Sequence, residues 1–240
     1  KIVCSPQSIG GVRALYGSGD SIGVKLDYIE QKEPNGIPSG FALANDSSQA
    51  RPAMAILGDN FFYGPNLGSS LEKITPEITT VFLKRVFDVK PFGAAKVSEG
   101  GTLEEISEKP QRPNTDLAIT GLYYFKPGDL DLVSEIKPSF RGETEIVDLL
   151  QRIMRDDAIH SQVLSRSTFW SDLGTYKSLS LVEDYVNSIE ATQLIHVLIP
   201  ELVAVEKGFV DVEYMAKIIR GYPKCLYRDY LLGWLEKRGF

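Results

Sequence analysis

The sequence predicts an α/β protein in which helices flank a mixed, mostly parallel central sheet and a small helical segment follows. Over the first half of the 240 residues, short β-rich runs alternate with helix-sized segments, which is typical of a sheet covered by helices. The apolar run at residues 54–57 is short, as suits a central strand buried on both faces. After Pro200 only amphipathic helical patterns follow. We therefore expect a core at residues 1–195 and a C-terminal helical segment at residues 196–240.

The first elements of the sheet are expected before residue 60. A strand end at residues 2–4 precedes a helix at residues 8–16, and a second strand follows at residues 24–29. The turn-forming residues Pro34, Asn35 and Gly36 then lead into a helix at residues 37–44.

The remaining elements are mostly strands up to residue 125 and mostly helices after it. We expect strands at residues 80–86, 93–97, 102–106, 118–125 and 163–164, with a hairpin turn at Gly100 and Gly101. We expect helices at residues 144–154, 175–194, 202–205, 212–219 and 227–235. Thr175 is the expected N-cap of the longest helix.

The composition excludes several classes of protein. Hydrophobic residues make up 43% and charged residues 24% of the chain, which excludes collagen-like, disordered and disulfide-scaffold proteins. The 26 Lys and Arg residues against 32 Asp and Glu residues give a net charge of −6. This charge balance predicts no broad basic surface for nonspecific nucleic-acid binding. An anionic ligand must be bound by local cations or by backbone N–H groups.

The cysteines and the apolar runs favour a cytoplasmic protein. Cys4 and Cys225 are far apart in sequence, which predicts buried thiols in a reducing compartment. No apolar run approaches the ~20 residues that a membrane span needs. The chain also opens without a basic and then apolar leader. We expect a protein that binds neither nucleic acid nor membrane.

Two aspartates stand out as candidate metal ligands. Asp59 directly follows the apolar run at residues 54–57, and ligands of α/β sheets bind at the carboxyl ends of strands. Asp172 lies in a predicted turn before a helix. Because Mg²⁺ is usually held by one or two carboxylates plus substrate phosphates, both aspartates could bind one ion. Asp59 and Asn60 could equally serve as turn residues, and Asp172 with Thr175 could simply begin the helix.

Two charged segments could bind a phosphorylated sugar. Glu108 and Lys109 follow a predicted strand and precede Pro110, so the carboxylate could accept from sugar hydroxyls while the ammonium meets a phosphate. Arg141 precedes a predicted helix and offers a second cation. A solvated turn, and acidic residues that complement a helix N-terminus, are the structural alternatives. The sequence contains no nucleophile elbow, Walker-type loop or Rossmann glycine fingerprint.

Seven short motifs lie in order along nearly the whole chain. They are Glu30-Gln31 with Pro34 and Gly36, Leu57-Gly58-Asp59-Asn60, Phe92-Gly93, Glu108-Lys109-Pro110, Thr120-Gly121-Leu122-Tyr123, Arg141-Gly142-Glu143 and Trp170-Ser171-Asp172-Leu173-Gly174. This series resembles the glucose-1-phosphate thymidylyltransferase family, also called dTDP-glucose pyrophosphorylases. The resemblance implies the Rossmann-like nucleotide-diphospho-sugar transferase fold. It also implies a reaction in which dTTP and glucose 1-phosphate become dTDP-glucose and pyrophosphate.

The resemblance implies roles for individual residues. Asp59 and Asp172 would hold Mg²⁺, and together with Lys109 they are the candidate catalytic residues. Gln31 and Gly36 would lie against the thymine. The remaining substrate-binding candidates are Phe92, Gly93, Glu108 and Ile119 around the glucose, Lys109 and Arg141 on its phosphate, and Tyr123 and Trp170. The resemblance further implies a homotetramer that serves dTDP-rhamnose and polysaccharide biosynthesis.

One part of the family pattern has no counterpart in this sequence. The family begins with a strand, a Gly-rich loop containing Thr-Arg-Leu, and then a Pro-Lys pair, and this segment grips the nucleoside triphosphate. Because the chain opens in what resembles the second strand, we expect at least one βα unit of about 30 residues upstream. Two interpretations stay open: an incompletely represented enzyme, or a naturally shortened relative that binds sugar nucleotides without catalysis.

Smaller departures from the family concern base selectivity. Residues 37–40 read Ile-Pro-Ser-Gly where the family usually has a Leu-Ala-x-Ala helix start beside the base. Leu173 stands where Thr is usual. An enzyme that uses UTP, or another sugar 1-phosphate, is therefore the alternative within the same class.

Overall fold

The computed structural model describes residues 1–49, 51–65, 67–139 and 142–240. Contacts divide the chain into two compact units, one of residues 33–182 and one of residues 1–32 together with residues 183–240. The N-terminal residues therefore pack with the C-terminal helices. The sequence instead predicts a division at residue 195, between a core and a C-terminal helical segment. That domain division stays a prediction.

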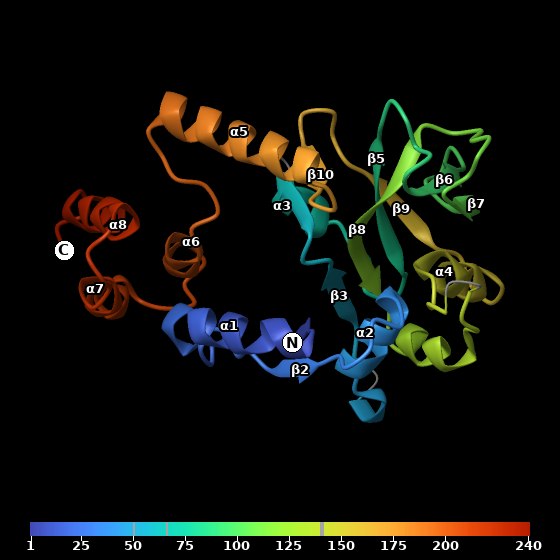
Figure 1. The fold of residues 1–240 in the computed structure, drawn as a ribbon, viewed down its shortest axis with the longest axis horizontal. Coiled ribbons are helices and arrows are strands. Elements are labelled where there is room, and N and C mark those ends of the chain that lie inside the picture. Colours follow the sequence, from blue (N-terminus) through green and yellow to red (C-terminus); the bar gives the residue numbers. More distant parts are fainter. Residues whose placement is uncertain (50, 66, 140–141) are drawn as a thin grey trace. The chain divides into compact units, whose positions relative to one another are not determined.

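The unit of residues 33–182 is built on a mixed sheet (Figure 1). Its strands lie in the order β7-β6-β8-β5-β9, and β3 also pairs with β8. These strands are β3 (Ala53–Ile56), β5 (Thr80–Arg85), β6 (Gly93–Val97), β7 (Leu103–Glu108), β8 (Leu117–Phe125) and β9 (His160–Val163). Each one overlaps a strand that the sequence predicts, so the mixed sheet of an α/β protein is confirmed.

The expectation that this sheet is mostly parallel is wrong. β8 pairs antiparallel with β3, β5 and β6, and β6 pairs antiparallel with β7. Among the described residues, β5 and β9 are the only parallel neighbours in this sheet. β3, β5, β6 and β9 point in one direction, but β8 lies among them and runs the other way. A strand covered on both faces is apolar in either direction, so the apolar runs did not reveal the pairing.

Strand β8 forms the centre of the core, and all nine of its residues are buried. Alternate side chains of a strand point to opposite faces of the sheet. Ile119 and Tyr123 join the apolar cluster that includes Leu149 of the helix α4 (Ile146–Met154). Leu122 joins a second cluster with Phe82. Burying one such side chain stabilises the fold by about 1.5–3 kcal/mol. The buried strand β8 therefore anchors its partners β3, β5 and β6.

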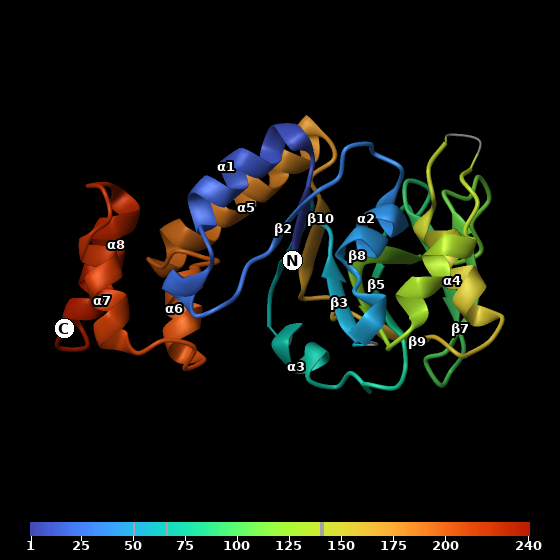
Figure 2. The same cartoon turned by 90° about the horizontal axis from the view of Figure 1, so that it is seen from below.

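Helices cover one face of the sheet. The covering elements are α2 (Ile37–Ala44), the 3₁₀ helix η3 (Asp129–Glu135) and α4, and Figure 2 shows α2 and α4 on the same side. Five residues of α4 are buried, because its apolar side chains recur at helical spacing. A short 3₁₀ helix, η2 (Ser47–Gln49), follows α2.

The second cluster is completed by α3 (Leu67–Leu71) and by two strands outside the main sheet, β4 (Asn60–Tyr63) and β10 (Phe169–Asp172). The two strands pair antiparallel with each other. The sequence predicts a turn around Asp172, and that expectation is wrong, because Asp172 ends β10. Neither of these two strands is among those predicted from the sequence. Four-residue strands that pair across a large sequence separation have no local turn signal to reveal them.

The other unit joins short N-terminal elements with the C-terminal helices. β1 (Ile2–Cys4) and β2 (Tyr28–Glu30) form a parallel pair, and α1 (Pro6–Tyr16) and the 3₁₀ helix η1 (Asp20–Ile22) lie between them in sequence. The helices that follow the sheet are α5 (Tyr176–Gln193), which begins in the first unit, and α6 (Pro200–Glu206), α7 (Val212–Arg220) and α8 (Leu226–Glu236). The helices predicted after Pro200 are confirmed, and they enclose an apolar cluster of their own.

The same unit contains a buried carboxylate and both cysteines. Glu201 is buried, and the hydroxyls of Tyr222 and Tyr227 donate to its carboxylate at 2.7 and 2.5 Å, which offsets the cost of burying the charge. Cys225 is exposed just before α8 and Cys4 is half-buried, so the prediction of buried thiols is wrong. Within the described ranges, no helix has both the length and the apolar character to cross a membrane.

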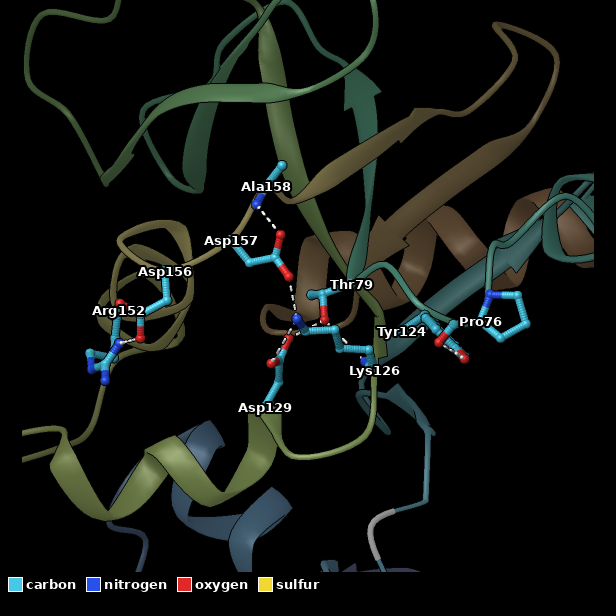
Figure 3. Close-up of polar contacts among 9 residues, drawn as sticks. All are labelled: Pro76, Thr79, Tyr124, Lys126, Asp129, Arg152, Asp156, Asp157 and Ala158. Carbon is cyan, nitrogen blue, oxygen red and sulfur yellow. Dashed lines mark hydrogen bonds and ion pairs between the residues drawn. The ribbon is translucent and has the colours of Figure 1, made fainter.

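A polar cluster joins the start of β5 to the end of β8 (Figure 3). The Thr79 hydroxyl donates to the buried carboxylate of Asp129 and accepts the backbone N–H of Lys126 at 3.0 Å. The Lys126 ammonium donates to Asp157 and lies 4.0 Å from the Asp129 carboxylate. Burial raises the pKa of Asp129, whereas the hydrogen bond from Lys126 lowers the pKa of Asp157. These side chains therefore fasten β5 and η3 to the segment after α4.

Candidate active site

The pairing of β4 with β10 brings the two candidate aspartates together. Asp172 lies opposite Asn60 in this ladder, and the Leu173 N–H donates to the Asp59 carbonyl oxygen at 2.6 Å. Asp172 does not cap the next helix, because Thr175 and Ser178 exchange the hydrogen bonds of that helix start. The backbone positions of Asp59 and Asp172 are thus neighbours although the residues are remote in sequence.

The side chain of Asn60 links three segments at this point. Its Nδ2 donates to the Asp59 carboxylate at 2.8 Å, and its Oδ1 accepts the Gly121 N–H at 3.1 Å and the Trp170 indole N–H at 2.8 Å. Two N–H donors on one atom identify that atom as the amide oxygen. Asn60 therefore orients the Asp59 carboxylate with respect to β8 and β10. From the sequence, Asn60 is a possible turn residue beside Asp59; its partners on β8 and β10 become visible only in the fold.

The glycine of the Thr-Gly-Leu-Tyr motif has a steric role. A Cβ atom on Gly121 would lie 2.5 Å from Cγ of Asn60 and within 2.7 Å of both polar atoms of its amide. Real Cβ atoms do not approach other atoms so closely. A glycine in the middle of a buried strand therefore makes room for the Asn60 side chain.

The candidates for sugar binding also converge. Gly93 pairs with Glu108 in the β6–β7 ladder, and the Lys109 N–H donates to the Phe92 carbonyl oxygen at 3.1 Å. A Cβ on Gly93 would lie 3.3 Å from Cδ1 of Ile119. Phe92, Gly93, Glu108, Lys109 and Ile119 therefore occupy adjacent positions at the ends of β6 and β7 and on the neighbouring β8.

The Glu108–Lys109 pair is held in an unusual backbone conformation. Lys109 has a φ of 42°, in the left-handed region that few residues other than glycine adopt. Its ammonium lies 3.8 Å from the Glu108 carboxylate. A conformation of this kind costs about 1–3 kcal/mol and is found most often at functional sites.

Trp170 and Tyr123 connect the sugar-binding candidates with the aspartates. The Trp170 ring lies 5.0 Å from the Phe92 ring between centroids, while its N–H binds Asn60. Tyr123 is buried, and burial raises the pKa of its phenol, with further contributions from the charges of Glu108 and Asp59. The phenol therefore lies within the field of carboxylates from both motifs.

Gly36 marks a second junction between remote motifs. It has a φ of 101°, and a Cβ there would lie 2.1 Å from the Thr144 carbonyl oxygen. Thr144 in turn donates its N–H and its hydroxyl to the Asn35 carbonyl oxygen, both at 2.8 Å. The Pro-Asn-Gly turn thus packs on the segment that follows Arg141. Thr144 is a residue that sequence reasoning missed.

Two candidates are placed differently. Arg141 lies outside the described residues. Gln31 belongs to the unit of residues 1–32 and 183–240, where its N–H donates to the Cys4 carbonyl oxygen at 2.8 Å. Within the described part of the chain, no group of three or more His, Cys, Asp or Glu side chains is placed to hold a metal ion.

The mixed sheet, and the motifs that lie on it and beside it, are those of one class of protein. The family model of nucleotidyl transferases matches residues 1–188, and the chain belongs to this family.

Within that class, several similar proteins are glucose-1-phosphate thymidylyltransferases by name. A glucose-1-phosphate thymidylyltransferase from Neisseria meningitidis is 31% identical, with 98% of this chain and 83% of the relative covered. One from Mycobacterium tuberculosis is 32% identical, with 99% and 83% covered. A solved structure from Bacillus anthracis, assigned as a glucose-1-phosphate thymidylyltransferase in complex with sucrose, superposes with a TM-score of 0.68 at 30% identity. That superposition covers 77% of this chain and 74% of the other.

Proposed function

We propose that this protein transfers a thymidylyl group from dTTP to glucose 1-phosphate, giving dTDP-glucose and pyrophosphate. The observation that carries the proposal is the β4–β10 ladder, which places Asp59 and Asp172 side by side. The similar proteins named above carry the name of this activity.

Asp59 and Asp172 would hold Mg²⁺. Asp172 ends β10 and Asp59 directly precedes β4, and two neighbouring carboxylates fit an ion that usually keeps one or two protein carboxylates and takes its remaining ligands from phosphates and water. When bound, the ion would neutralise phosphate charge next to the reacting phosphorus. Asn60 supports this role because its amide already orients the Asp59 carboxylate.

The ends of β6 and β7 would bind the sugar phosphate. Glu108 can accept hydrogen bonds from sugar hydroxyls, and its ladder partner Gly93 packs closely on Ile119, which fixes the end of β7. Phe92 and Trp170 form an apolar wall, and the Tyr123 phenol can donate a hydrogen bond. We assign the positive charge of Lys109 to the sugar phosphate, with Arg141 as the second cation.

The nucleotide would lie at the Pro-Asn-Gly turn. Gly36 and Gln31 are proposed to contact the thymine. The tight packing of Gly36 on Thr144 supports a rigid binding surface, because the turn cannot shift without losing the two hydrogen bonds to Asn35. Rigid support of this kind is what orientation of a reactant requires.

The chemistry needs no protein nucleophile. A phosphate oxygen of glucose 1-phosphate attacks the α-phosphorus of dTTP, a new P–O bond forms, and the bond to the departing pyrophosphate breaks. Positioning and charge neutralisation supply the catalysis in phosphoryl-transfer reactions of this kind. The residues above would hold the two reactants in line and balance the charge.

The test is a pyrophosphate-release assay with the purified protein, dTTP, glucose 1-phosphate and Mg²⁺. Asp172→Asn should lower turnover at least 100-fold without changing the unfolding midpoint, since it removes a ligand charge and little volume. Asp229→Asn on the exposed surface of α8 is the matched control, and we expect wild-type turnover from it.

Three results would each contradict part of the proposal. Wild-type turnover of Asp172→Asn would remove Asp172 from the metal site. A preference for UTP over dTTP, or for another sugar 1-phosphate, would replace the thymidylyl assignment. Tight binding of dTDP-glucose with no Mg²⁺-dependent turnover would indicate a noncatalytic relative.

The cellular setting follows from the same proposal. We propose a cytoplasmic homotetramer whose product feeds dTDP-rhamnose and polysaccharide biosynthesis. Size-exclusion chromatography with light scattering tests the tetramer directly.

A further inference from the structure

The ammonium group of Lys84 on β5 is surrounded by backbone carbonyl groups. It donates to the carbonyl oxygens of Ser165 and Thr168, each at 2.6 Å, and to that of Arg166 at 3.3 Å. An ammonium has three N–H donors and no acceptor, so three carbonyl groups match its bonding capacity. A half-buried lysine with this set of partners is not a freely solvated side chain.

These carbonyl groups belong to the tight turn at residues 165–168, which is held from two sides. The Thr168 N–H donates to the Ser165 carbonyl oxygen at 3.0 Å, and the preceding Leu164 N–H donates to Leu83 at 2.8 Å. On the other side, a Cβ on Gly64 would lie 2.8 Å from the Ser167 carbonyl oxygen. The turn is therefore fixed between β5 and the end of β4.

This turn leads directly into β10. Thr168 is buried, and the next four residues form the strand that carries Trp170 and Asp172 to their partners. A change in the turn would therefore shift the ladder that places Asp172 next to Asp59.

We propose that Lys84 is a positioning residue whose ammonium holds the turn at residues 165–168, so that β10 presents Asp172 and Trp170 at the candidate active site. The effect on turnover rests on the proposed function. The effect on the turn itself does not. None of the seven motifs contains Lys84, and no role was assigned to it from the sequence.

The electrostatic environment of Lys84 is unfavourable for a cation. Burial lowers the pKa of Lys84, and the nearby charge of Arg166 lowers it further. The cation is therefore kept in an unfavourable environment by its hydrogen bonds to the carbonyl groups, which are of the stronger charge-assisted kind.

The variants are Lys84→Met, which keeps a long side chain without the charge, and Lys84→Arg, which keeps a cation. Lys96→Met on β6 is the control, because Lys96 is another strand lysine of the same sheet but forms an exposed ion pair with Glu104. Hydrogen–deuterium exchange reports on peptides that span residues 165–173, where the Leu173 amide bonds to Asp59. Mn²⁺ binding by calorimetry, unfolding midpoints and the Mg²⁺ dependence of pyrophosphate release complete the measurements.

We expect Lys84→Met to speed exchange at residues 165–173 at least tenfold and to weaken Mn²⁺ binding and the Mg²⁺ response about 10- to 100-fold, as loss of a supporting contact does at metal sites. Lys84→Arg should lie between Lys84→Met and the wild type. Lys96→Met should match the wild type in every readout.

Two outcomes would overturn the proposal. In the first, Lys84→Met leaves exchange at residues 165–173 unchanged. In the second, Lys84→Met lowers the unfolding midpoint while the folded protein keeps wild-type Mn²⁺ affinity, which would make Lys84 a general stabilising residue. If the wild type releases no pyrophosphate, the proposed function fails, while exchange and Mn²⁺ binding still decide the role of Lys84.

Discussion

Replacing Gly121 with alanine tests whether the packing of Asn60 organises the site. The added Cβ would lie 2.5–2.7 Å from the three terminal atoms of the Asn60 side chain, and β8 cannot move away because it is buried on both faces. The Asn60 side chain must therefore leave its place. It would then lose its hydrogen bonds to the Asp59 carboxylate, the Gly121 N–H and the Trp170 indole.

The expected cost follows from those three bonds. A typical intramolecular hydrogen bond contributes about 0.5–1.5 kcal/mol, and a partly buried donor left without a partner costs about 1–3 kcal/mol. The Trp170 N–H is such a donor. We therefore expect Gly121→Ala to lower the free energy of unfolding by about 2–4 kcal/mol. Turnover of the folded protein should fall about 100-fold, since a displacement of about 1 Å in a catalytic group has that effect.

The assays are urea unfolding and pyrophosphate release. Gly10→Ala is the matched control, because Gly10 lies inside α1 with no atom near its missing Cβ. Removing a glycine from a helix interior should stabilise the protein by about 0.5–1 kcal/mol. The same Gly→Ala change should therefore raise the free energy of unfolding at Gly10 and lower it at Gly121. In an Asn60→Ala background the steric conflict is gone, and Gly121→Ala should cost almost nothing further. Wild-type stability of Gly121→Ala, or additive effects in the double variant, would refute the reasoning.

Two further predictions concern stability. Gly36→Ala should lower the unfolding midpoint by at least 10 °C in a thermal melt, because its Cβ would lie 2.1 Å from the Thr144 carbonyl oxygen at a φ of 101°. An unchanged midpoint would contradict the close packing of Gly36 on Thr144. Asp129→Asn should stabilise the protein at pH 7 in urea unfolding, because burial raises the pKa of Asp129 while the amide oxygen still accepts from Thr79. A raised folded pKa means that the contribution of this carboxyl is present below the unfolded pKa of about 3.9 and is lost as pH rises through the folded pKa. The gain from the substitution should therefore shrink as the pH approaches 4, and a gain that does not change with pH would contradict the assignment.

The parts of the fold that sequence could predict are those with a local period. The helix α2 was predicted at residues 37–44 and has those bounds, and β6 was predicted at residues 93–97 and has those bounds. In each case turn-forming residues border a short apolar or small-residue run, so the signal lies within about ten residues. The antiparallel course of β8 has no such signal, because it depends on which strands meet rather than on the residues within one strand.

The candidate site shows the same limit. Asp59 and Asp172 stand out as residues, but their proximity depends on β4 pairing with β10, and each of those strands is four residues long. Asn60 and Thr144 act through partners that lie far away in sequence. Lys84 has carbonyl groups as partners, which every residue possesses. A contact with backbone atoms leaves no residue pattern to detect, so only the fold could reveal it.

Tyr123 shows how the two sides of the site are physically joined. Tyr123 lies in the apolar cluster that includes Leu149 and Leu150 of α4, so its side chain is held against the sheet. Burial raises its pKa, and the negative charges of Glu108 and Asp59 raise it further, which means that both carboxylates act on one hydroxyl. A change of charge at Asp59 would therefore change the electrostatic field at the Tyr123 hydroxyl, where the charge of Glu108 also acts. The Tyr123 hydroxyl is therefore one point at which the carboxylate before β4 and the carboxylate at the end of β7 both act, although the three residues come from separate motifs.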